Sequence, residues 1–307
     1  MTAPIEVDIE GRRVRLTNLD KVLYPSGFTK AEVVDYYARI APIAVPHVAG
    51  RCITFRRFPD GTDADGFFEK QCAQHHPDWM QTALGPGDRR GGIHYCRIEE
   101  TAAMVWAANL AAIELHAPMA LANDLDTPRA LVFDFDPGPD TGVSECCQVA
   151  LGVAAVLDSV GLRAWCKTSG SKGMQMYVPL NTPGATHEGA ANFALAVGQV
   201  MERQFAHDTS TPLGVTTVMA KDARPGKVFV DWSQNAHHKT TIAPYSLRAR
   251  PAPTVSTPLT WDEVSNGADG DVELRFEAGD VLRRVGDGGD LFAPVLTLEQ
   301  ELPQPAR

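Results

Sequence analysis

Short apolar runs that end in turn residues alternate with longer amphipathic stretches along this chain. The clearest run, Leu-Val-Phe at 131–133, leads to two aspartates and is stopped by Pro-Gly-Pro. Runs of the same kind predict strands over residues 51–58, 131–136, 164–168, 174–180 and 228–232. Amphipathic or alanine-rich stretches predict helices over residues 101–116, 144–160 and 188–205. The irregular alternation favours an α/β or α+β fold with a central mixed sheet.

Turn and capping residues predict further element boundaries. Residues 5–16 alternate apolar and polar positions around a Glu-Gly pair, which predicts a small hairpin. Thr29 and Glu32 have the spacing of a capping box, and Thr260 and Glu263 repeat it. We therefore expect a helix to begin after each of these two threonines.

The chain is long and apolar enough to bury a large core. It has 307 residues, of which 44% are hydrophobic, and it contains no internal repeat, low-complexity tract or long linker. Its first residues form neither a cationic nor an apolar leader, and no apolar run is long enough to span a bilayer. These features predict a soluble, cytoplasmic protein.

The net charge of −10 argues against a nucleic-acid binder, but the charge is unevenly distributed. Residues 261–301 are strongly acidic, whereas residues 12–57 and 221–250 are locally basic. A phosphate is attracted by the local electric field rather than by the net charge, so these two basic stretches are compatible with nucleic-acid binding. The plainer interpretation, solvated helix faces, also stays open at this point.

The six cysteines are expected to be free thiols. They include no C-x-x-C pair, so neither a zinc ribbon nor a disulfide framework is indicated. Free thiols also agree with a reducing cytosol.

Three aspartates stand at the ends of apolar runs and are candidate metal ligands. Asp134 and Asp136 lie two positions apart, so on a strand their side chains point to the same face. Asp231 ends a second strand, Val-Phe-Val. Adjacent carboxylates repel unless a cation lies between them, and oxygen ligands suit Mg²⁺ or Mn²⁺. Three of them could hold the two metals used for phosphoryl transfer; the alternative is a solvated pair plus an aspartate that begins a turn.

The segment 168–173, Thr-Ser-Gly-Ser-Lys-Gly, lies between two predicted strands and can bind phosphate. Its glycines allow backbone N–H groups to converge on an anion, and Ser169 and Lys172 add a hydroxyl and a charge. The segment 239–250 adds further basic residues. Neither pattern is a P-loop, and each could be an ordinary surface turn.

Taken together, these segments resemble the archaeo-eukaryotic primase superfamily. The blocks DFDPGPD, TSGSKGMQMYVPL, KVFVDWSQN and KTTIAPYSLRAR occur in the order that this superfamily shows. With LTNLDKVLYP and FFEK near the N-terminus, the chain resembles the polymerase domain of bacterial ligase D and stand-alone primase-polymerases. The resemblance implies a central mixed sheet like that of an RNA-recognition motif, packed against an N-terminal α/β module. It implies one domain over 1–307, with the N-terminal module at about 1–100, the catalytic core at about 101–260 and an acidic segment at 261–307.

The resemblance also implies roles for individual residues. The catalytic and metal-binding carboxylates would be Asp134, Asp136 and Asp231. Residues at the incoming nucleotide would be Ser169, Lys172 and Arg248, with Arg56, Arg57, His116, Arg224, Gln234 and Gln175 around it. The downstream 5′-phosphate would be bound by Asn18, Lys21 and Lys30, and the template by Phe67, Phe68 and Lys70. Without the resemblance, a phenylalanine pair is more often part of a core than a stacking platform, although exposed aromatic rings do stack on bases.

The implied activity is DNA-dependent nucleotide addition, preferentially of ribonucleotides, at short gaps or breaks that carry a 5′-phosphate. It would use two Mn²⁺ or Mg²⁺ ions and nucleoside triphosphates. We expect a monomer near the nucleoid that depends on a separate DNA ligase.

One residue departs from the superfamily's pattern and keeps alternatives open. Gln175 stands where the second motif normally has a histidine; glutamine can hydrogen-bond but cannot become cationic. A module that binds gapped, 5′-phosphorylated DNA with little or no polymerase activity is therefore the competing class. A phosphatase that uses the first aspartate of DFDPG as its nucleophile is a third reading, but it gives the FFEK and SGSKG blocks no role.

Overall fold

The computed structural model describes residues 3–87, 92–208 and 211–303. It divides the chain into two compact units, each built from three separate segments. Unit 1 comprises Met1–Leu125, Thr240–Thr257 and Phe276–Asp290, and unit 2 comprises Asp126–Lys239, Pro258–Arg275 and Leu291–Arg307. Within the described residues, no helix has the length and apolar character to cross a membrane.

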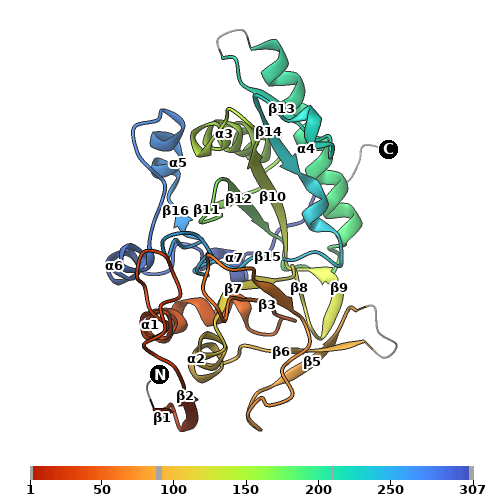
Figure 1. Cartoon of the computed structure of the whole chain (residues 1–307). Coiled ribbons are helices and arrows are strands. Elements are labelled where there is room, and N and C mark those ends of the chain that lie inside the picture. The colour runs from red at the N-terminus through yellow and green to blue at the C-terminus, as the bar shows by residue number, and fades with distance from the viewer. Residues whose placement is uncertain (1–2, 88–91, 209–210, 304–307) are drawn as a thin grey trace. The chain divides into compact units, whose positions relative to one another are not determined.

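Unit 2 is organised around a six-stranded mixed sheet (Figure 1). Its strand order is β13-β14-β10-β12-β11-β16, and only the β13–β14 pair is parallel. The strands are β10 (Ala130–Pro137), β11 (Trp165–Thr168), β12 (Met174–Pro179), β13 (Gly214–Thr216), β14 (Lys227–Asp231) and β16 (Pro258–Leu259).

Two helices cover one face of this sheet. They are α3 (Val143–Ser159) and α4 (His187–His207). Cys146 of α3 approaches the carbonyl of Phe135, and Gly198 of α4 lies against Val230, which pairs with Phe135 across the two central strands. Since side chains alternate along a strand, Asp134 and Asp136 point to the opposite face of the sheet.

The remaining elements of unit 2 are short. They are the helices α5 (Trp261–Ala268) and α7 (Pro294–Thr297), and the 3₁₀ turns η1 (Lys221–Ala223) and η2 (Trp232–Asn235). The strand pair β8 (Ala120–Leu121) and β9 (Asp124–Pro128) lies where the chain passes from unit 1 to unit 2.

Unit 1 contains a four-stranded antiparallel sheet with helices packed around a separate core. The sheet order is β15-β7-β3-β4. Its strands are β3 (Thr54–Arg57), β4 (Phe67–Glu69), β7 (Ala112–Ala117) and β15 (Thr241–Ile242). Unit 1 also contains two hairpins, β1 (Ile5–Ile9) with β2 (Arg12–Leu16) and β5 (Thr82–Gly85) with β6 (Ile93–Cys96).

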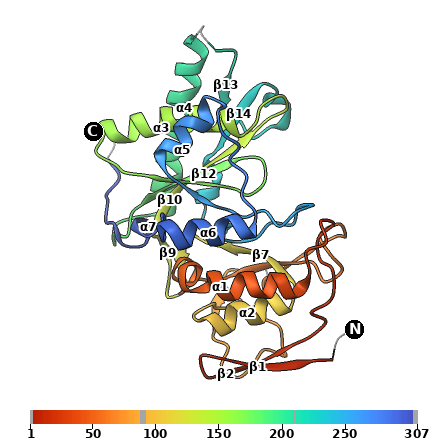
Figure 2. The ribbon, with the colours of Figure 1, turned by 90° about the vertical axis from the view of Figure 1, so that its left-hand side faces the viewer.

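The helices of unit 1 are α1 (Lys30–Val48), α2 (Thr101–Asn109) and α6 (Ala278–Gly288). Helices α1 and α2 lie side by side (Figure 2). Helix α1 begins with the predicted capping box: the Glu32 amide donates to Thr29 Oγ1, and the Thr29 amide donates to Glu32 Oε2. The same pair of bonds joins Thr260 and Glu263 at the start of α5.

Most predicted elements are confirmed. The hairpin over 5–16, the five strands and the helices over 144–160 and 188–205 all occur, with ends shifted by up to three residues. The fold class, a mixed α/β or α+β arrangement, is confirmed as well. The single-domain organisation stays a prediction.

The helix predicted over residues 101–116 is wrong in its second half. Helix α2 ends at Asn109, Ala111 adopts a positive φ of 55°, and the chain then enters strand β7. An uninterrupted apolar run fits a buried helix and a buried strand equally well, so periodicity does not separate them. The correction places His116 on a strand.

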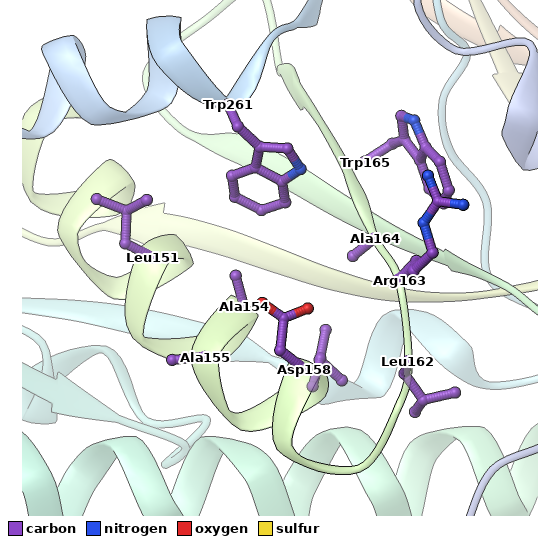
Figure 3. Close-up of a pocket in the computed structure, with 10 residues that line it drawn as sticks. Leu151, Ala154, Ala155, Asp158, Leu162, Arg163, Ala164, Trp165 and Trp261 are labelled. Atoms are coloured by element: carbon purple, nitrogen blue, oxygen red, sulfur yellow. The ribbon is translucent and has the colours of Figure 1, made fainter.

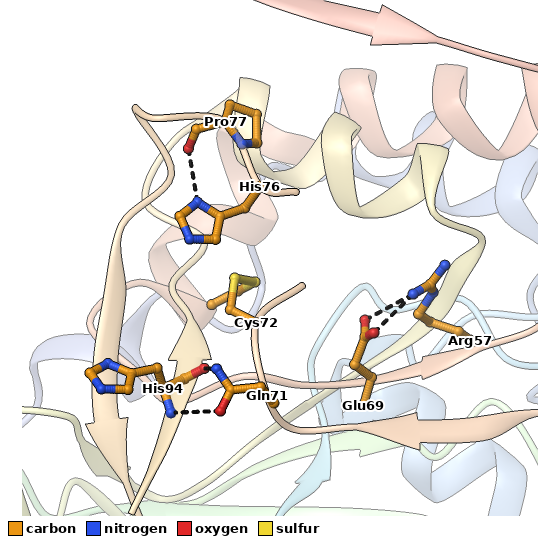
Figure 4. The surroundings of a disulfide bond; sticks show 8 residues. Arg57, Glu69, Gln71, Cys72, His76, Pro77 and His94 are labelled. Atoms are coloured by element: carbon orange, nitrogen blue, oxygen red, sulfur yellow. Dashed lines mark hydrogen bonds and ion pairs between the residues drawn. A yellow bond between two sulfur atoms is a disulfide. The ribbon is translucent and has the colours of Figure 1, made fainter. Parts of the chain in front are cut away.

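The prediction that all six cysteines are free thiols is also wrong. Cys72 and Cys96 form a disulfide, with their Cα atoms 4.8 Å apart (Figure 4). The Cys72 amide donates to the His94 carbonyl over 2.7 Å, so backbone pairing brings the segment after β4 against β6. No motif marks this pairing, because the two cysteines are 24 residues apart in the sequence.

We expect the disulfide to stabilise unit 1. Closing a loop of 24 residues restricts the unfolded chain and should raise the free energy of unfolding by about 3 kcal/mol. The measurement is denaturant unfolding of the oxidised protein against a Cys72→Ala, Cys96→Ala variant. Reductant should destabilise the native protein and leave this variant unchanged; equal midpoints for all samples would contradict the prediction.

Candidate active site

The candidate carboxylates lie on the face of the unit 2 sheet opposite α3 and α4, where neighbouring strands bring polar side chains into one line. Asp134 pairs directly with Asp231 on one side and with Gln175 on the other, and Gln175 pairs with Lys167. Residues directly opposite each other on antiparallel strands share a face. We call these four residues the cross-strand row. Asp136 lies two residues beyond Asp134 on the same face, near the end of β10.

The surroundings of Asp134 and Asp136 disfavour their charged carboxylate forms. Desolvation and the charges of Asp136 and Asp231 raise the pKa of Asp134 to about 7, although a hydrogen bond from Gln175 and the charge of Lys167 act to lower it. Desolvation and the Asp231 charge also raise the pKa of Asp136, while Arg224 lowers it, even though this residue lies at the more exposed end of the strand. A divalent cation would relieve this repulsion, so the donor set fits one by charge.

Asp231 is held by its own turn. Its Oδ1 accepts hydrogen bonds from the Ser233 amide and hydroxyl, and its Oδ2 accepts one from Gln234 Nε2. The residue is therefore both the cap of η2 and a member of the cross-strand row. Within residues 3–87, 92–208 and 211–303, no three acidic, histidine or cysteine side chains form a ready-made metal cluster. The three aspartates lie on one face of two neighbouring inner strands, but they do not form a ready-made metal cluster.

The phosphate-binding candidate is a tight turn that packs against the same strand end. Ser169 Oγ accepts hydrogen bonds from the amides of Ser171 and Gly173, each over 3.2 Å. A side chain at Gly173 would meet the Phe135 carbonyl oxygen at 2.1 Å, so only glycine lets the turn approach β10 this closely. Lys172, at the tip, is exposed.

Arg224 lies near Asp136, at the end of β10. Its guanidinium lies 3.8 Å from the ring centre of Phe229, the residue that pairs with Asp136. Its Nη2 donates to the Met219 carbonyl, while its buried Nε has no hydrogen-bond partner among the described residues. The guanidinium is therefore held beside Asp136 with part of its donor capacity unused.

Unit 1 holds a second polar cluster, centred on a buried glutamate. Glu114 Oε1 accepts hydrogen bonds from Arg248 Nε and the Ala249 amide, both over 3.1 Å. Its Oε2 lies 2.9 Å from His116 Nε2 and 3.4 Å from Arg56 Nη1. Burial alone would raise the pKa of Glu114, but the bond from His116 and the charge of Arg248 prevail and lower it to about 2. The structure thus brings three predicted nucleotide-site residues together around one carboxylate.

Helix α1 and a buried serine fix this cluster. The Tyr37 hydroxyl donates to the Ile113 carbonyl over 2.6 Å and accepts from the Leu247 amide over 3.1 Å. Ser246 Oγ accepts from the Leu115 amide over 2.9 Å. These bonds join the strand that carries Glu114 to the segment that carries Arg248, so the cluster is preorganised by the core of unit 1.

The two phenylalanines of FFEK are exposed rather than part of the core. They are 45% (Phe67) and 60% (Phe68) exposed on edge strand β4. Arg57 and Arg56 place their guanidinium groups 5.3 and 5.4 Å from the ring centres of Phe67 and Phe68, respectively. Arg57 also pairs with Glu69 over 2.9 Å (Figure 4). The core alternative for this pair is therefore excluded.

The surface beside these rings is concave and polar at its edge. The hollow beside β4 has a volume of about 430 Å³. Its lining includes Phe67, Phe68, Lys70 and Gln71. The exposed Lys70 adds a positive charge next to the aromatic platform.

The three predicted 5′-phosphate residues also come together, within unit 1. The Lys21 amide donates to the Asn18 carbonyl, and the Lys30 amide donates to the Lys21 carbonyl. Lys30 is buried, and its Nζ donates to the Thr17 carbonyl over 2.6 Å. Desolvation, then the charges of Lys21 and Arg57, lower the pKa of Lys30 to about 8. Lys30 is therefore not a solvent-exposed lysine of α1, the commoner situation for a lone helical lysine.

Sequence reasoning missed two residues of these clusters, Glu114 and Lys167. Each lies within an apolar run that the pattern marks only as a buried element. A charged residue inside such a run has to find an opposite charge or a strong hydrogen-bond partner. That rule could have marked both as members of polar networks, but the sequence does not name their partners.

Unit 2 also has a hollow that is separate from the three candidate aspartates. It has a volume of about 510 Å³ and lies between α3 and the segment leading to β11 (Figure 3). Trp165 and Trp261 contribute to its lining, and Asp158 is the one carboxylate among the described residues that line it. None of the predicted site residues lines it.

A mixed sheet with carboxylates on neighbouring central strands, on the face opposite its two helices and approached by a glycine-rich turn, defines a primase-type nucleotidyltransferase fold. The chain belongs to the family described as "LigD, primase-polymerase domain", whose model matches residues 29–292. The predicted resemblance is thereby confirmed.

Similar proteins agree with this assignment. The chain is 45% identical to the multifunctional non-homologous end joining protein LigD of Mycolicibacterium smegmatis over 287 residues, 92% of this chain and 36% of the relative. It is 29% identical to the bifunctional LigD of Bacillus subtilis, covering 83% of this chain and 40% of that protein. The chain thus spans well under half the length of these relatives.

A solved structure shows the same fold. The polymerase domain of Mycobacterium tuberculosis ligase D, determined in complex with DNA, matches with a TM-score of 0.83 and 40% sequence identity. The match covers 92% of this chain and 98% of that one.

Proposed function

We propose that this chain is a DNA-dependent nucleotidyltransferase that adds nucleotides to the primer at short gaps or breaks. The observation that carries the proposal is the set Asp134, Asp136 and Asp231 on adjacent central strands, on the sheet face opposite α3 and α4. Membership of the LigD primase-polymerase family supports it. Similarity to a polymerase domain solved in complex with DNA supports DNA as the partner.

Asp134, Asp136 and Asp231 would hold two Mg²⁺ or Mn²⁺ ions. When bound, such ions lower the pKa of a primer 3′-hydroxyl and stabilise charge on the departing pyrophosphate. Asp231 would have to exchange some of its present hydrogen bonds with Ser233 and Gln234 for metal contacts. The protein's own contribution would be to hold these carboxylates on one face of neighbouring strands in spite of their mutual repulsion.

The remaining clusters would position the substrates. In unit 2, the Ser169 turn, Lys172 and Arg224 would bind the triphosphate, with Gln234 and Gln175 at the carboxylates. In unit 1, the Glu114 cluster presents Arg56, His116 and Arg248 as preorganised cations or donors. Phe67 and Phe68 would stack on template bases, a contact worth roughly 1–3 kcal/mol per base. We propose that both units act in the same reaction.

The cellular setting is proposed with the activity. The protein would act as a monomer at DNA ends near the nucleoid, in the cytoplasm. It would favour ribonucleotides and leave a nick for a separate DNA ligase. A filled gap still has an unsealed backbone, so the proposed chemistry requires a sealing enzyme.

Primer extension on a one-nucleotide gap tests the proposal. The assay compares ribonucleotides with deoxyribonucleotides, and Mg²⁺ with Mn²⁺, on the same template. Templated addition of one nucleotide with either metal supports the proposal. Tight binding to the gap without extension under any condition would favour the second candidate, a gap-binding module.

That second candidate is motivated by Gln175, which replaces the usual histidine beside the carboxylates. In the structure Gln175 is 4% exposed and is held between Lys167 and Asp134. It therefore contributes a neutral amide where a titratable ring is usual. The extension assay separates the two candidates directly.

We expect tighter binding to a gap with a 5′-phosphate than to the same gap with a 5′-hydroxyl, by at least about tenfold. A few charge-assisted hydrogen bonds from Lys21 and Lys30, at about 1.5–3 kcal/mol each, are sufficient. A Lys21→Ala, Lys30→Ala variant should lose most of this preference in a fluorescence-anisotropy titration. The control is Arg13→Ala, which removes an exposed charge from strand β2.

The preference should also depend on pH. Lys30 has a pKa of about 8, so its cation is present below that pH and lost above it. Raising the pH from about 7 to about 9 should therefore weaken binding to the 5′-phosphate. Equal affinity for the two gaps at low salt across this range would remove the site from the proposal.

A further inference from the structure

One member of the cross-strand row, Lys167, is a fully buried lysine. Lys167 is 0% exposed, and its Nζ lies 2.6 Å from Gln175 Oε1. It also lies 5.6 Å from the centre of the Tyr177 ring, on the same face. A buried ammonium group is costly unless hydrogen bonds and opposite charge compensate it. Along the row, the carboxylate nearest in register is Asp134, on the far side of Gln175.

Lys167 decides which way the Gln175 amide points. An ammonium group has only donors, so it can bond only the amide oxygen. The amide nitrogen of Gln175 is then left for Asp134, and a carboxylate can only accept. The hydrogen bond between Gln175 and Asp134 favours the charged carboxylate, as a bond donated by an amide nitrogen would. If the amide were reversed, the Gln175 nitrogen would face the Lys167 ammonium group, which also only donates. The Gln175 oxygen would then face the Asp134 carboxylate, which also only accepts.

We propose that Lys167 is a positioning residue for the carboxylate site, acting through Gln175 to orient Asp134 toward a divalent cation. The chain of contacts runs from the Lys167 ammonium to Gln175 Oε1, and from the Gln175 amide nitrogen to Asp134. Lys167 thus fixes the orientation of the Gln175 side chain, because its ammonium group can bond only the amide oxygen. The inference rests on the proposed function, in which Asp134 binds metal.

Mn²⁺ binding to the nucleotide-free protein tests this inference without depending on catalysis. Titration followed by electron paramagnetic resonance gives the affinity for Mn²⁺ alone. Lys167→Met keeps the length of the side chain but removes the donor, and Gln175→Leu removes the amide. Because an outer partner of a metal ligand typically contributes 10–100-fold in affinity, each variant should bind Mn²⁺ about tenfold more weakly.

The direction and coupling of these effects separate positioning from other roles. Loss of a nearby positive charge by itself would tighten Mn²⁺ binding, so weakening in Lys167→Met cannot come from charge alone. If Lys167 acts through Gln175, the double variant should bind no more weakly than Gln175→Leu. Lys167→Arg, which keeps a donor, should recover most of the affinity. Arg203→Met, at an exposed position of α4, controls for the lost charge.

Unfolding measurements on the same variants show whether the effect is merely structural. Lys167→Met removes one partner of a buried polar contact and should be less stable than wild type, so Mn²⁺ binding is compared under conditions where every variant is fully folded. Wild-type Mn²⁺ affinity in Lys167→Met, tighter binding, or multiplicative effects of the two substitutions would each overturn the inference. If wild type binds Mn²⁺ no better than Asp134→Ala, the inference and the proposed metal site both fall.

Discussion

Asp134→Ala should reduce nucleotide addition by at least about a hundred- to a thousandfold, the size of effect expected when a group that stabilises transition-state charge is removed. Asp134 is the central member of the cross-strand row, paired with Asp231 and next to Asp136 on β10. Its loss would leave two carboxylates for the proposed pair of metals. Single-turnover primer extension on a one-nucleotide gap measures the change.

The same substitution should leave binding to gapped DNA nearly unchanged. The residues proposed to contact DNA lie in unit 1, in the segments that carry Lys21, Lys30 and the phenylalanine pair. A gel-shift titration run beside the extension assay compares the two effects. Equal losses of binding and catalysis would contradict the separation of roles.

The metal-free fold should lose stability as the pH rises, because of Asp134. Its pKa is raised from 3.8 to about 7 in the folded protein, so folding favours the protonated form. The stability that this proton contributes is present at low pH and is lost as the pH rises from about 4 to about 7. Asp134→Asn should flatten this part of the unfolding curve. If wild type and Asp134→Asn show the same dependence of stability on pH, Asp134 is not its source and the prediction is wrong.

The sequence predicted the central sheet well because its elements have unambiguous patterns. The run before Asp134 is short, rich in strand formers and closed by Pro-Gly-Pro, and it became β10. Capping residues fixed the start of α1 for the same reason: Thr29 and Glu32 satisfy backbone donors locally. Local signals of this kind do not depend on the rest of the chain.

The errors arose where distant contacts decide the structure. The run after α2 is apolar enough for a helix, but pairing with β3 makes it strand β7. Cys72 and Cys96 form a disulfide because backbone pairing brings their segments together, and spacing alone does not reveal it. Glu114 shows the same limit at the site: its partners Arg56 and Arg248 are 58 and 134 residues away in the sequence.

Glu114→Ala should be among the most destabilising single substitutions in unit 1. The carboxylate is 1% exposed and accepts bonds from Arg248, His116, Arg56 and the Ala249 amide. Its removal leaves several cationic or donor groups without their shared partner. Breaking a buried ion pair in this way costs roughly 3–5 kcal/mol. Denaturant unfolding gives the change in the free energy of unfolding.

Two further variants identify the cause of that loss. Asp35→Ala removes an exposed acid from the Arg39 pair of α1 and should cost less than about 1 kcal/mol. Glu114→Gln keeps the shape and an acceptor but not the charge. It should weaken the pH dependence that Glu114 contributes: with its pKa lowered from 4.5 to about 2, the carboxylate stabilises the fold above pH 4.5 and loses that effect as the pH falls.

Glu114→Gln should also weaken nucleoside triphosphate binding, because Arg248 and Arg56 would no longer be fixed by a common charge. Equilibrium dialysis of labelled nucleotide measures this directly, at a pH where the variant is fully folded. We expect a loss of about tenfold, which corresponds to one charge-assisted hydrogen bond. If the variant binds nucleotide as wild type does, Glu114 serves only the stability of unit 1.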